Sequence, residues 1–563
     1  MRDLPEILEV DDARLEDVLR RVEQAMDEKD AQLLRALIES YAYVSELIED
    51  KNTSIKRLRQ LFFGARTEKT KTVTAGAADQ PAPNNTPDSL PEKTPNPPSE
   101  GSSPSSSTAA AAADVEKPTA AGHGRNGADA YQGAERIDLR HPSLQAGDSC
   151  PACGDGTVYD KQPGVLVHIS GQPPLAAKIY QVQKLRCHLC GKVFTAPAPP
   201  GAGDAKYDAT AASMIALLKY GSGLPFNRLE GLQGNLGVPL PASTQWDIVN
   251  AAAENLAPAF EELVRQAAQG DVLHNDDTTV KILELMGENR SKALAQQADS
   301  ADDARTGLFT SGVVALRDGH RLALFFSGRQ HAGENLVDVL QHRAAELPPP
   351  IQMCDALSRN LPEELETIVA NCLAHARRQF VDVYDRFPEP CRHLLETLAV
   401  VYRHDAIAKQ KALLPEARLA FHQQESGPTM QRLHEWLTRQ LEEKLVEPNS
   451  GLGGPIRYML KHWEKLTLFL RQPGAPLDNN LCERALKKAI LHRKNALFYK
   501  TQNGARVGDL YMSLIHTCQL NEVNPFDYLT QLQQHAEFAA SPGLWMPWNY
   551  REALSSESSE PTK

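Results

Sequence analysis

Leu477-Asp-Asn-Asn-Leu-Cys-Glu-Arg-Ala-Leu-Lys-Lys-Ala-Ile-Leu-His-Arg-Lys-Asn495 is the most informative stretch of the chain. It predicts a helix with one carboxylate, Glu483, among cations. Its small and apolar side chains recur at helical spacing and predict a buried stripe of Cys482, Ala485, Leu486, Ala489 and Ile490. The polar side consists of Asn480, Glu483, Arg484, Lys487 and Lys488. A lone carboxylate among cations is typical of a metal ligand beside a phosphate backbone.

Two acidic residues upstream of this helix, Asp276 and Asp355, stand where short apolar runs end. The chain between residues 270 and 358 predicts three strands, then a helix, then a fourth strand, with a turn at Asp318-Gly319. The expected bounds are 272–283, 308–314 and 322–326 for the strands, 334–347 for the helix and 351–354 for the last strand. Acids on the first and last strands of this order are typical of an RNase H-like nucleotidyl-transfer core. We therefore expect an α/β chain of several domains.

Together, Asp276, Asp355 and Glu483 predict an Asp-Asp-Glu metal site that acts on DNA. Hard divalent cations such as Mg²⁺ prefer oxygen ligands. Two such ions about 4 Å apart can activate a nucleophile and stabilise the leaving oxygen of an in-line displacement. Neighbouring residues of a strand point to opposite faces, so Asp276 and Asp277 cannot both enter the pocket, and Asp276 shares its side with His274.

Each acid also has a purely structural explanation. Asp276 and Asp277 could be solvated turn residues, and Asp355 could cap the helix that follows it. Asn480 and Glu483 stand at the spacing of a capping box, so Glu483 could cap its own helix. The joint placement of three acids on a sheet-plus-helix order favours the metal site.

Composition and charge limit the class of protein. The chain has 563 residues, a length expected for roughly three to four domains. Its net charge of -12 argues against a uniformly basic coat, so contact with DNA must use local basic patches. The N-terminus lacks an apolar signal core, and no run of about 18 apolar residues occurs. We expect a cytoplasmic protein with no membrane partner, associated with the nucleoid when it is bound to DNA.

Residues 1–140 divide into two segments of different composition. Residues 1–69 predict a helical or coiled-coil segment, because apolar positions between Leu37 and Phe62 step alternately by four and three residues. Self-association along this seam and packing of one amphipathic helix on its own domain both fit the pattern. Residues 70–140 are rich in Pro, Ser and Ala and predict a disordered linker, because they cannot bury enough apolar area to offset chain entropy.

Four of the nine cysteines form two Cys-x-x-Cys pairs within residues 141–200, and a glycine follows each pair. The four residues are Cys150, Cys153, Cys187 and Cys190. Two such pairs can close a tetrahedral thiolate site around structural Zn²⁺, and each glycine permits a tight turn. A redox role is the alternative, but redox motifs rarely come as two such pairs. We therefore expect a zinc ribbon, which does not by itself indicate DNA binding.

Helices are expected on either side of the sheet segment. Residues 201–269 predict short helices, with Asp208 and Ser243 as N-caps. They could form a helix-turn-helix reader of DNA or an ordinary helical packing subdomain. The catalytic core is expected over residues 270–500, with a helical insertion at 360–470. Residues 501–563 predict a C-terminal helix over 505–540 and a loose tail after Trp548.

Basic residues gather in two places along the chain. His375-Ala-Arg-Arg378 lies on an expected helix and could position phosphates or form surface ion pairs. A zinc site through Cys372 and His375 lacks a second ligand pair. The other basic stretch surrounds Glu483 and contains few acids. The residues expected to contact DNA are His375, Arg377, Arg378, Arg484, Lys487, Lys488, Arg493 and Lys494.

These motifs resemble those of the insertion-sequence-66 family of transposases (TnpC-type) along almost the whole chain. The similar segments are 58–69, the four paired cysteines, 273–278, 372–378, 478–486 with 493–495, and 513–529. The motifs are long and occur in the family's order, which makes the resemblance specific. The chain departs from the family pattern at Asp277, where Glu is usual, and at Ala356-Leu357, where Gly-Tyr is usual.

The resemblance implies a DDE transposase with Asp276, Asp355 and Glu483 as its triad and Mg²⁺ or Mn²⁺ as its catalytic metal. The implied reaction is hydrolytic nicking at the element ends, followed by attack of the freed 3′-hydroxyl on target DNA. The implied partners are the element ends, target DNA, further copies of the chain on DNA, and companion proteins encoded by the element.

Two rival hypotheses belong to other classes. An inactive relative that keeps its zinc ribbon and DNA contacts would act as a repressor or scaffold, and the intact triad favours the enzyme over it. A non-mobile RNase H-like nuclease would lack terminal inverted repeats around its coding region.

Overall fold

The structure is a computed structural model that describes residues 205–287, 306–362 and 365–557, with shorter stretches between residues 136 and 199. In these shorter stretches, strands β1 (Lys184–Arg186) and β2 (Val193–Thr195) form an antiparallel pair. Residues 1–135 and all four cysteines of the two Cys-x-x-Cys pairs lie outside the described residues. The helical N-terminal segment, the linker and the zinc ribbon therefore stay predictions.

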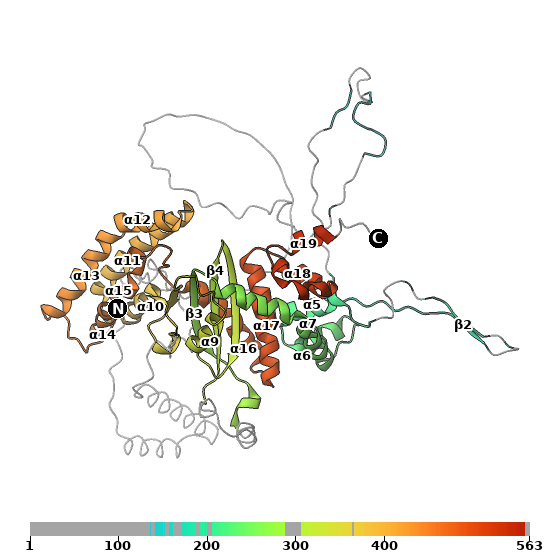
Figure 1. The fold of residues 1–563 in the computed structure, drawn as a ribbon, viewed down its shortest axis with the longest axis horizontal. Helices are drawn as coiled ribbons and strands as arrows, with labels where there is room; N and C mark the ends of the chain where they lie inside the picture. Colours follow the sequence, from blue (N-terminus) through green and yellow to red (C-terminus); the bar gives the residue numbers. More distant parts are fainter. Residues whose placement is uncertain are drawn as a thin grey trace, which may run out of the picture. The chain divides into compact units, whose positions relative to one another are not determined.

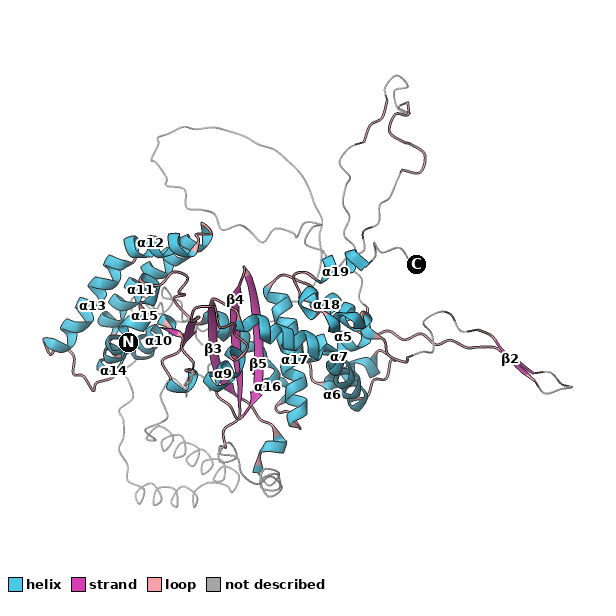
Figure 2. Ribbon diagram, viewed as in Figure 1, coloured by secondary structure: helices cyan, strands magenta, loops and turns pink. Residues whose placement is uncertain are grey.

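A five-stranded mixed sheet forms the centre of the described chain (Figure 2). Its strands are β3 (Val272–Thr279), β4 (Phe309–Arg317), β5 (His320–Gly328), β6 (Ile351–Cys354) and β7 (Ile368–Asn371). They lie in the order β5-β4-β3-β6-β7. β4 is antiparallel to β3 and β5, whereas β6 runs parallel to β3 and β7. The turn between β4 and β5 has positive φ at Asp318 and Gly319, as a tight hairpin turn requires.

The sequence predicts four of these strands, and the structure confirms them with shifted bounds. β7 lies within the segment 360–470, which was expected to be helical, so that prediction is wrong at its N-terminal end. The reason is that β7 is a four-residue run, too short for alternation to distinguish a strand from a helix. The helix expected at 334–347 is α9 (Ala332–Leu340), which begins earlier because His331 and Glu334 form a capping box.

Helices N-terminal to the sheet cover part of it. They are α5 (Ala209–Ala216), a π-helical turn η2 (Leu217–Gly221), α6 (Phe226–Asn235) and α7 (Ala242–Ala268). Asp208 caps α5 by accepting a hydrogen bond from the Ala211 amide, as expected. Ser243 is not a cap, because α7 begins at Ala242 after the extended residue Pro241. These helices share one hydrophobic core with the sheet, so they serve packing whether or not they also read DNA.

A group of helices follows β7 and has its own hydrophobic core (Figure 1). The helices are α10 (Leu373–Val383), α11 (Pro388–Gln410), α12 (Pro415–Glu425), α13 (Gly427–Glu442), α14 (Gly453–Lys461) and α15 (Trp463–Leu466). This core also takes in Val272 of β3 and Met353 of β6. The expected helical insertion therefore exists, and it packs on the strands that carry the acids.

Four helices complete the described chain, with short 3₁₀ turns between the last two. They are α16 (Asn480–Ala496), α17 (Gln502–Leu520), α18 (Pro525–Gln534) and α19 (Tyr550–Glu557). The single helix expected over 505–540 is two helices, because Asn524 caps a new helix that has Pro525 at its first position. The loose tail expected after Trp548 is also wrong in part, since α19 forms there.

Side chains of α17 cover the open edge of the sheet at β5. Asn521, Thr517, Ser513 and Asp509 accept hydrogen bonds from the backbone amides of Arg321, Ala323, Phe325 and Ser327, in that order. Positions four residues apart on a helix are separated by about 6 Å along its axis, and alternate residues of a strand are about 6.6 Å apart. Because these two spacings nearly match, side chains at every fourth helical position can bond every second backbone amide of the strand. An edge strand whose amides are paired in this way is not free to pair with another chain.

Asp509 makes the stability of the fold depend on pH. Burial raises the pKa of Asp509 to about 7, although its hydrogen bonds from Ser327 oppose the rise. In an unfolded chain an aspartate titrates near pH ~4. A carboxyl group whose pKa is higher in the folded than in the unfolded protein stabilises the fold at a pH below its pKa in the unfolded chain. This stabilisation is lost as the pH rises through its pKa in the folded protein.

We therefore expect Asp509→Asn to be more stable than wild type above pH 7 by roughly 2–4 kcal/mol, and about equal to it near pH 4. Urea unfolding at several pH values measures the difference. Parallel pH profiles for the two proteins would contradict the assignment.

No helix within the described ranges combines the length and the apolarity that a membrane crossing requires.

Candidate active site

The two aspartates stand at equivalent positions of neighbouring parallel strands. In the register of β3 and β6, Val272 pairs with Ile351 and His274 with Met353. Two residues further along both strands, the same register places Asp276 beside Asp355. Acids at the carboxyl ends of adjacent parallel strands lie close together, at the edge where open sheets commonly bind their ligands.

Glu483 reaches the aspartates because α16 packs closely on the sheet. Cys482 donates a hydrogen bond from Sγ to the carbonyl oxygen of Gly312, at 3.3 Å. Gly312 is the β4 residue that pairs with Asp276 in the β3–β4 register. A Cβ at Gly312 would lie 3.0 Å from the Leu486 side chain, so the glycine permits the close approach of the helix. Glu483, next to Cys482, is thereby held over the strand that carries Asp276.

The carboxylates form one electrostatic cluster. Burial, together with the neighbouring charges of Asp355, Asp277 and Glu483, raises the pKa of Asp276 to about 7. The amide of Asp277 donates a hydrogen bond to Asp276 Oδ1 at 2.8 Å and opposes the rise. A buried carboxyl surrounded by other carboxylates is costly to ionise unless a cation is present.

Asp277 points to the other face of the sheet, as the alternation of a strand requires. Its carboxylate is 2.8 Å from Nδ1 of His331 and 3.3 Å from the guanidinium of Arg359, and its side chain is almost completely buried. The prediction that the two adjacent acids lie on opposite faces is confirmed for Asp277, and the entry of Asp276 into a catalytic pocket stays a prediction. Asp277 is not a solvated turn residue, because it is paired and buried.

Asp355 is fixed by the loop that follows β6. Its Oδ1 accepts hydrogen bonds from the Leu357 amide at 3.1 Å and from Asn360 Nδ2 at 2.5 Å. The Asn360 carbonyl oxygen in turn accepts from the side-chain amides of Asn275 and Gln352. The short 3₁₀ helix η5 (Ser358–Asn360) has Leu357 at its N-cap, so Asp355 does not cap it in the way considered from the sequence.

Glu483 does not complete the capping box that its spacing allows. The N-cap of α16 is Asn479, one residue before the predicted Asn480, and it makes no side-chain cap. The Glu483 side chain instead faces α10, where Oε2 lies 3.4 Å from the Arg378 guanidinium and Oε1 lies 3.7 Å from His375 Nδ1. Both Glu483 Oε1 and His375 Nδ1 are buried atoms without a hydrogen-bond partner.

Asn479 joins three elements at the site, and sequence reasoning missed it. It is fully buried, and its Oδ1 is 3.1 Å from Nδ1 of the buried His274. Its Nδ2 donates to the Asn275 carbonyl at 3.0 Å, and its amide donates to the Cys372 Sγ at 3.2 Å. The start of α16 is thus tied to β3 and to α10. The sequence shows only two adjacent asparagines at the start of the helix, and this pattern is equally typical of an N-cap.

The structure brings Cys372, His375 and Glu483 together, with their ligand atoms within 4.8 Å of one another. Burial raises the pKa of Cys372 to about 12. Without a metal ion the thiol keeps its proton, and a bound metal would lower this pKa. The three residues offer one ligand atom fewer than a closed zinc site uses, so the zinc site through Cys372 and His375 stays discounted.

The predicted DNA contacts divide into three groups. His375 and Arg378 are turned toward Glu483, and Arg493 donates from Nη1 to the Thr279 hydroxyl at 2.6 Å, so these three hold elements of the site together. Arg377 and Lys488 are half-buried. Arg484, Lys487 and Lys494 are exposed and form a row along α16.

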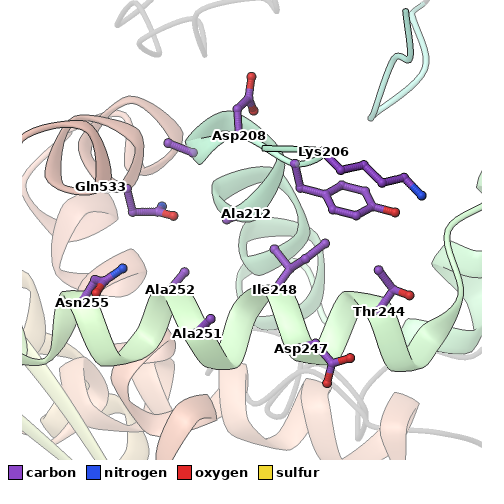
Figure 3. Close-up of a pocket in the computed structure, with 12 residues that line it drawn as sticks. Lys206, Asp208, Ala212, Thr244, Asp247, Ile248, Ala251, Ala252, Asn255 and Gln533 are labelled. Carbon is purple, nitrogen blue, oxygen red and sulfur yellow. The ribbon is translucent and has the colours of Figure 1, made fainter. Parts of the chain in front are cut away.

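Two cavities among the described residues bear on this cluster. One of about 250 Å³ adjoins it and is lined by residues that include Asp355, His375 and Arg378. The other, of about 540 Å³, lies against α5, α7 and α18 (Figure 3). In Figure 3 its two carboxylates, Asp208 and Asp247, point away from one another, so this second cavity offers no convergent acids.

Comparisons with known proteins show the family of the chain. Three similar proteins come from Sinorhizobium fredii (strain NBRC 101917 / NGR234), and each has the name of an uncharacterized protein. The protein y4hP is 27% identical over 448 residues, which are 74% of this chain and 75% of that protein. The protein y4jD is 26% identical over 383 residues, 65% and 71% of the two chains, and y4qI is 27% identical over 342 residues, 60% and 61%. The model of the transposase IS66 family matches residues 205–507. This match spans more than half of the chain, which therefore belongs to the IS66 family of transposases.

Proposed function

We propose that this protein is a DDE transposase that cuts and joins DNA strands at the ends of an insertion sequence with a divalent metal ion. One observation carries the proposal. Asp276, Asp355 and Glu483 come from distant parts of the chain, yet the charges of Asp355 and Glu483 act on Asp276 and, together with burial, raise its pKa to about 7. A fold that only needed to be stable would gain by separating these charges.

The topology of the sheet supports an RNase H-like core. The chain order of three strands, a helix and a fourth strand is the one expected from the sequence, and the structure adds β7 and the spatial order β5-β4-β3-β6-β7. β7 belongs to this core, so the helical insertion begins after Asn371.

The acids fit a hard divalent cation. Asp276, Asp355 and Glu483 supply carboxylate oxygens, and Glu483 Oε1 is buried without a hydrogen-bond partner. These three residues would hold Mg²⁺ or Mn²⁺. When bound, such ions lower the pKa of a nucleophilic water or hydroxyl and stabilise the charge that develops on the leaving oxygen.

The other residues of the site keep these ligands in place. Asn360 fixes the orientation of Asp355, and Arg378 of α10 holds the Glu483 carboxylate at a distance of 3.4 Å. The exposed cations on α16 would neutralise phosphates and hold the DNA backbone beside Glu483. Preorganised charges of this kind lower the barrier because they need no rearrangement during the reaction.

Strand transfer with purified protein, labelled element-end DNA and Mg²⁺ tests the proposal, with Glu483→Gln as a parallel sample. We expect joined products from wild type and none from the variant, which keeps the size of the side chain but loses the charge. The rival function, an inactive relative that acts as a repressor or scaffold, predicts binding to the ends without joining in Mg²⁺ or Mn²⁺. Addition of the companion proteins separates that outcome from a missing partner.

The zinc ribbon, assembly of several copies on DNA, and the need for companion proteins remain predictions from the sequence and the resemblance.

A further inference from the structure

An apolar tip projects at the end of α16. Leu497 is 61% exposed and the next residue, Phe498, is 44% exposed. Tyr159, Tyr180, Phe194 and Phe498 are the exposed tyrosine, phenylalanine and tryptophan side chains among the described residues, and Phe498 is the one that follows the helix carrying Glu483. An exposed aromatic side chain contributes free energy to binding when a partner covers it.

The backbone of this tip is strained. Leu497 has φ +69° and ψ -42°, and the Phe498 amide donates to the Ala496 carbonyl at 2.9 Å, which makes a three-residue γ-turn around Leu497. A γ-turn with positive φ is rare, and a branched side chain makes it more costly. Strained backbone of this kind is concentrated at functional sites and persists where the surrounding structure holds it.

The residues that follow hold the tip rigidly. Tyr499 is buried, its amide donates to the Lys281 carbonyl at 2.8 Å, and its carbonyl accepts from the Leu283 amide at 2.9 Å. Arg493 donates to the Thr279 hydroxyl and so ties the end of α16 to the strand that carries Asp276. The chain is therefore held to β3 and the segment after it both before the tip, at Arg493, and after it, at Tyr499, and this fixes the position of the tip relative to the carboxylate cluster.

A row of cations leads from the carboxylate cluster to the tip. Arg484, Lys487 and Lys494 are exposed on α16 and recur at helical spacing, so they lie along one face. Arg484 follows Glu483 directly. From Glu483 to Ala496 the helix rises about 20 Å, at 1.5 Å per residue. DNA that followed this row would carry its phosphates over the cations and its bases past Phe498.

We propose that Leu497 and Phe498 form a wedge that stacks on an unpaired nucleobase of the bound DNA end. The inference rests on the proposed function and adds the place where the duplex is opened. Apolar and aromatic side chains that enter a base step unstack it, and the flanking cations supply the attraction that this requires. The span of about 20 Å places the base roughly six base pairs from the phosphate that is cut, at 3.4 Å per base pair.

Fluorescence of 2-aminopurine tests the wedge, because this base analogue becomes brighter when it leaves the stack. Duplexes that carry the element end would contain the analogue at one position at a time. The proteins are wild type, Phe498→Ala, Phe498→Trp, and Leu414→Ala as a matched control, since Leu414 is 73% exposed outside α16. We expect a rise at positions about six pairs from the cut with wild type, Phe498→Trp and Leu414→Ala. We expect Phe498→Ala to lose the rise and to bind roughly tenfold more weakly.

The outcomes separate the wedge from the proposed function. Wild type that binds and cuts the ends without any rise in fluorescence overturns the wedge and leaves the transposase intact. Wild type that neither binds nor cuts the ends, with companion proteins present, overturns both. If Phe498→Ala keeps the rise but dissociates an oligomer in light scattering, the tip contacts a second copy of the chain, and the wedge is wrong.

Discussion

Replacement of Asp276 by asparagine is expected to lower the rate of strand cleavage by about 10³-fold, while DNA binding and the fold persist. Loss of one carboxylate ligand removes several kcal/mol of charge stabilisation, and each 1.36 kcal/mol corresponds to a factor of ten. Asparagine can still accept the 2.8 Å hydrogen bond from the Asp277 amide. It also removes a charge that Asp355 and Glu483 repel, so the melting temperature is expected to stay equal or to rise.

The neighbouring residue supplies a matched control. Asp277→Asn makes the same replacement of a carboxylate by an amide at the next residue of the strand. The Asp277 side chain lies on the opposite face, where it contacts His331 and Arg359. We expect this variant to lose stability by about 1–3 kcal/mol, because a buried charge-assisted pair is broken. Its cleavage rate at 25 °C is expected to fall less than tenfold.

Single-turnover cleavage of a labelled end, with thermal unfolding of the same samples, measures both effects. Equal losses of cleavage in the two variants would mean that the face of the strand is irrelevant, and the assignment of Asp276 would then fail.

Much of this fold could be predicted because its elements have local patterns. The strands around residues 272–279 and 351–354 and the helix at 480–496 are apolar runs or stripes of regular period. The acids of the proposed site stand out in the sequence because each interrupts or ends such a pattern. Their order along the chain then resembled that of a known family, and the match to residues 205–507 confirmed the family.

The features that could not be predicted depend on contacts between distant residues. Asn479 bonds His274 across 205 positions of sequence, and Asp509 bonds Ser327 across 182. Nothing near Asn479 distinguishes a buried junction from a helix cap, and nothing near Asp509 indicates that it lies on the edge of a sheet. His375 and Arg378 were expected to face phosphates for the same reason, because their partner Glu483 is about a hundred residues away.

Asn479→Ala is expected to weaken the site as well as the fold. The change leaves His274 Nδ1 and the Asn275 carbonyl buried and without their partner, which costs about 2–5 kcal/mol for two unpaired groups. The backbone amide that bonds Cys372 remains, so α16 keeps one of its ties to α10. We expect the variant to fold, with its α16 less firmly fixed relative to β3.

A loose α16 changes the distance between Glu483 and Asp276, and these two residues are proposed to bind the same metal. We therefore expect Asn479→Ala to require a several-fold higher Mg²⁺ concentration for half-maximal cleavage, with a lower rate at saturation, because small displacements of positioned groups reduce rates strongly. The titration of cleavage against Mg²⁺ at 25 °C measures this effect separately from binding of DNA.

Leu437→Ala is the control that separates positioning from stability. Leu437 is fully buried in α13, within the core of the helical insertion, and its truncation also costs about 2–5 kcal/mol. If the Mg²⁺ requirement followed stability alone, both variants would shift it equally, and Asn479 would be an ordinary core residue. A shift confined to Asn479→Ala means that the junction between α16 and β3 sets the geometry of the metal ligands. The buried amide would then have been retained for the reaction, since an apolar side chain could fill the same space without unpaired polar groups if its neighbours were changed with it.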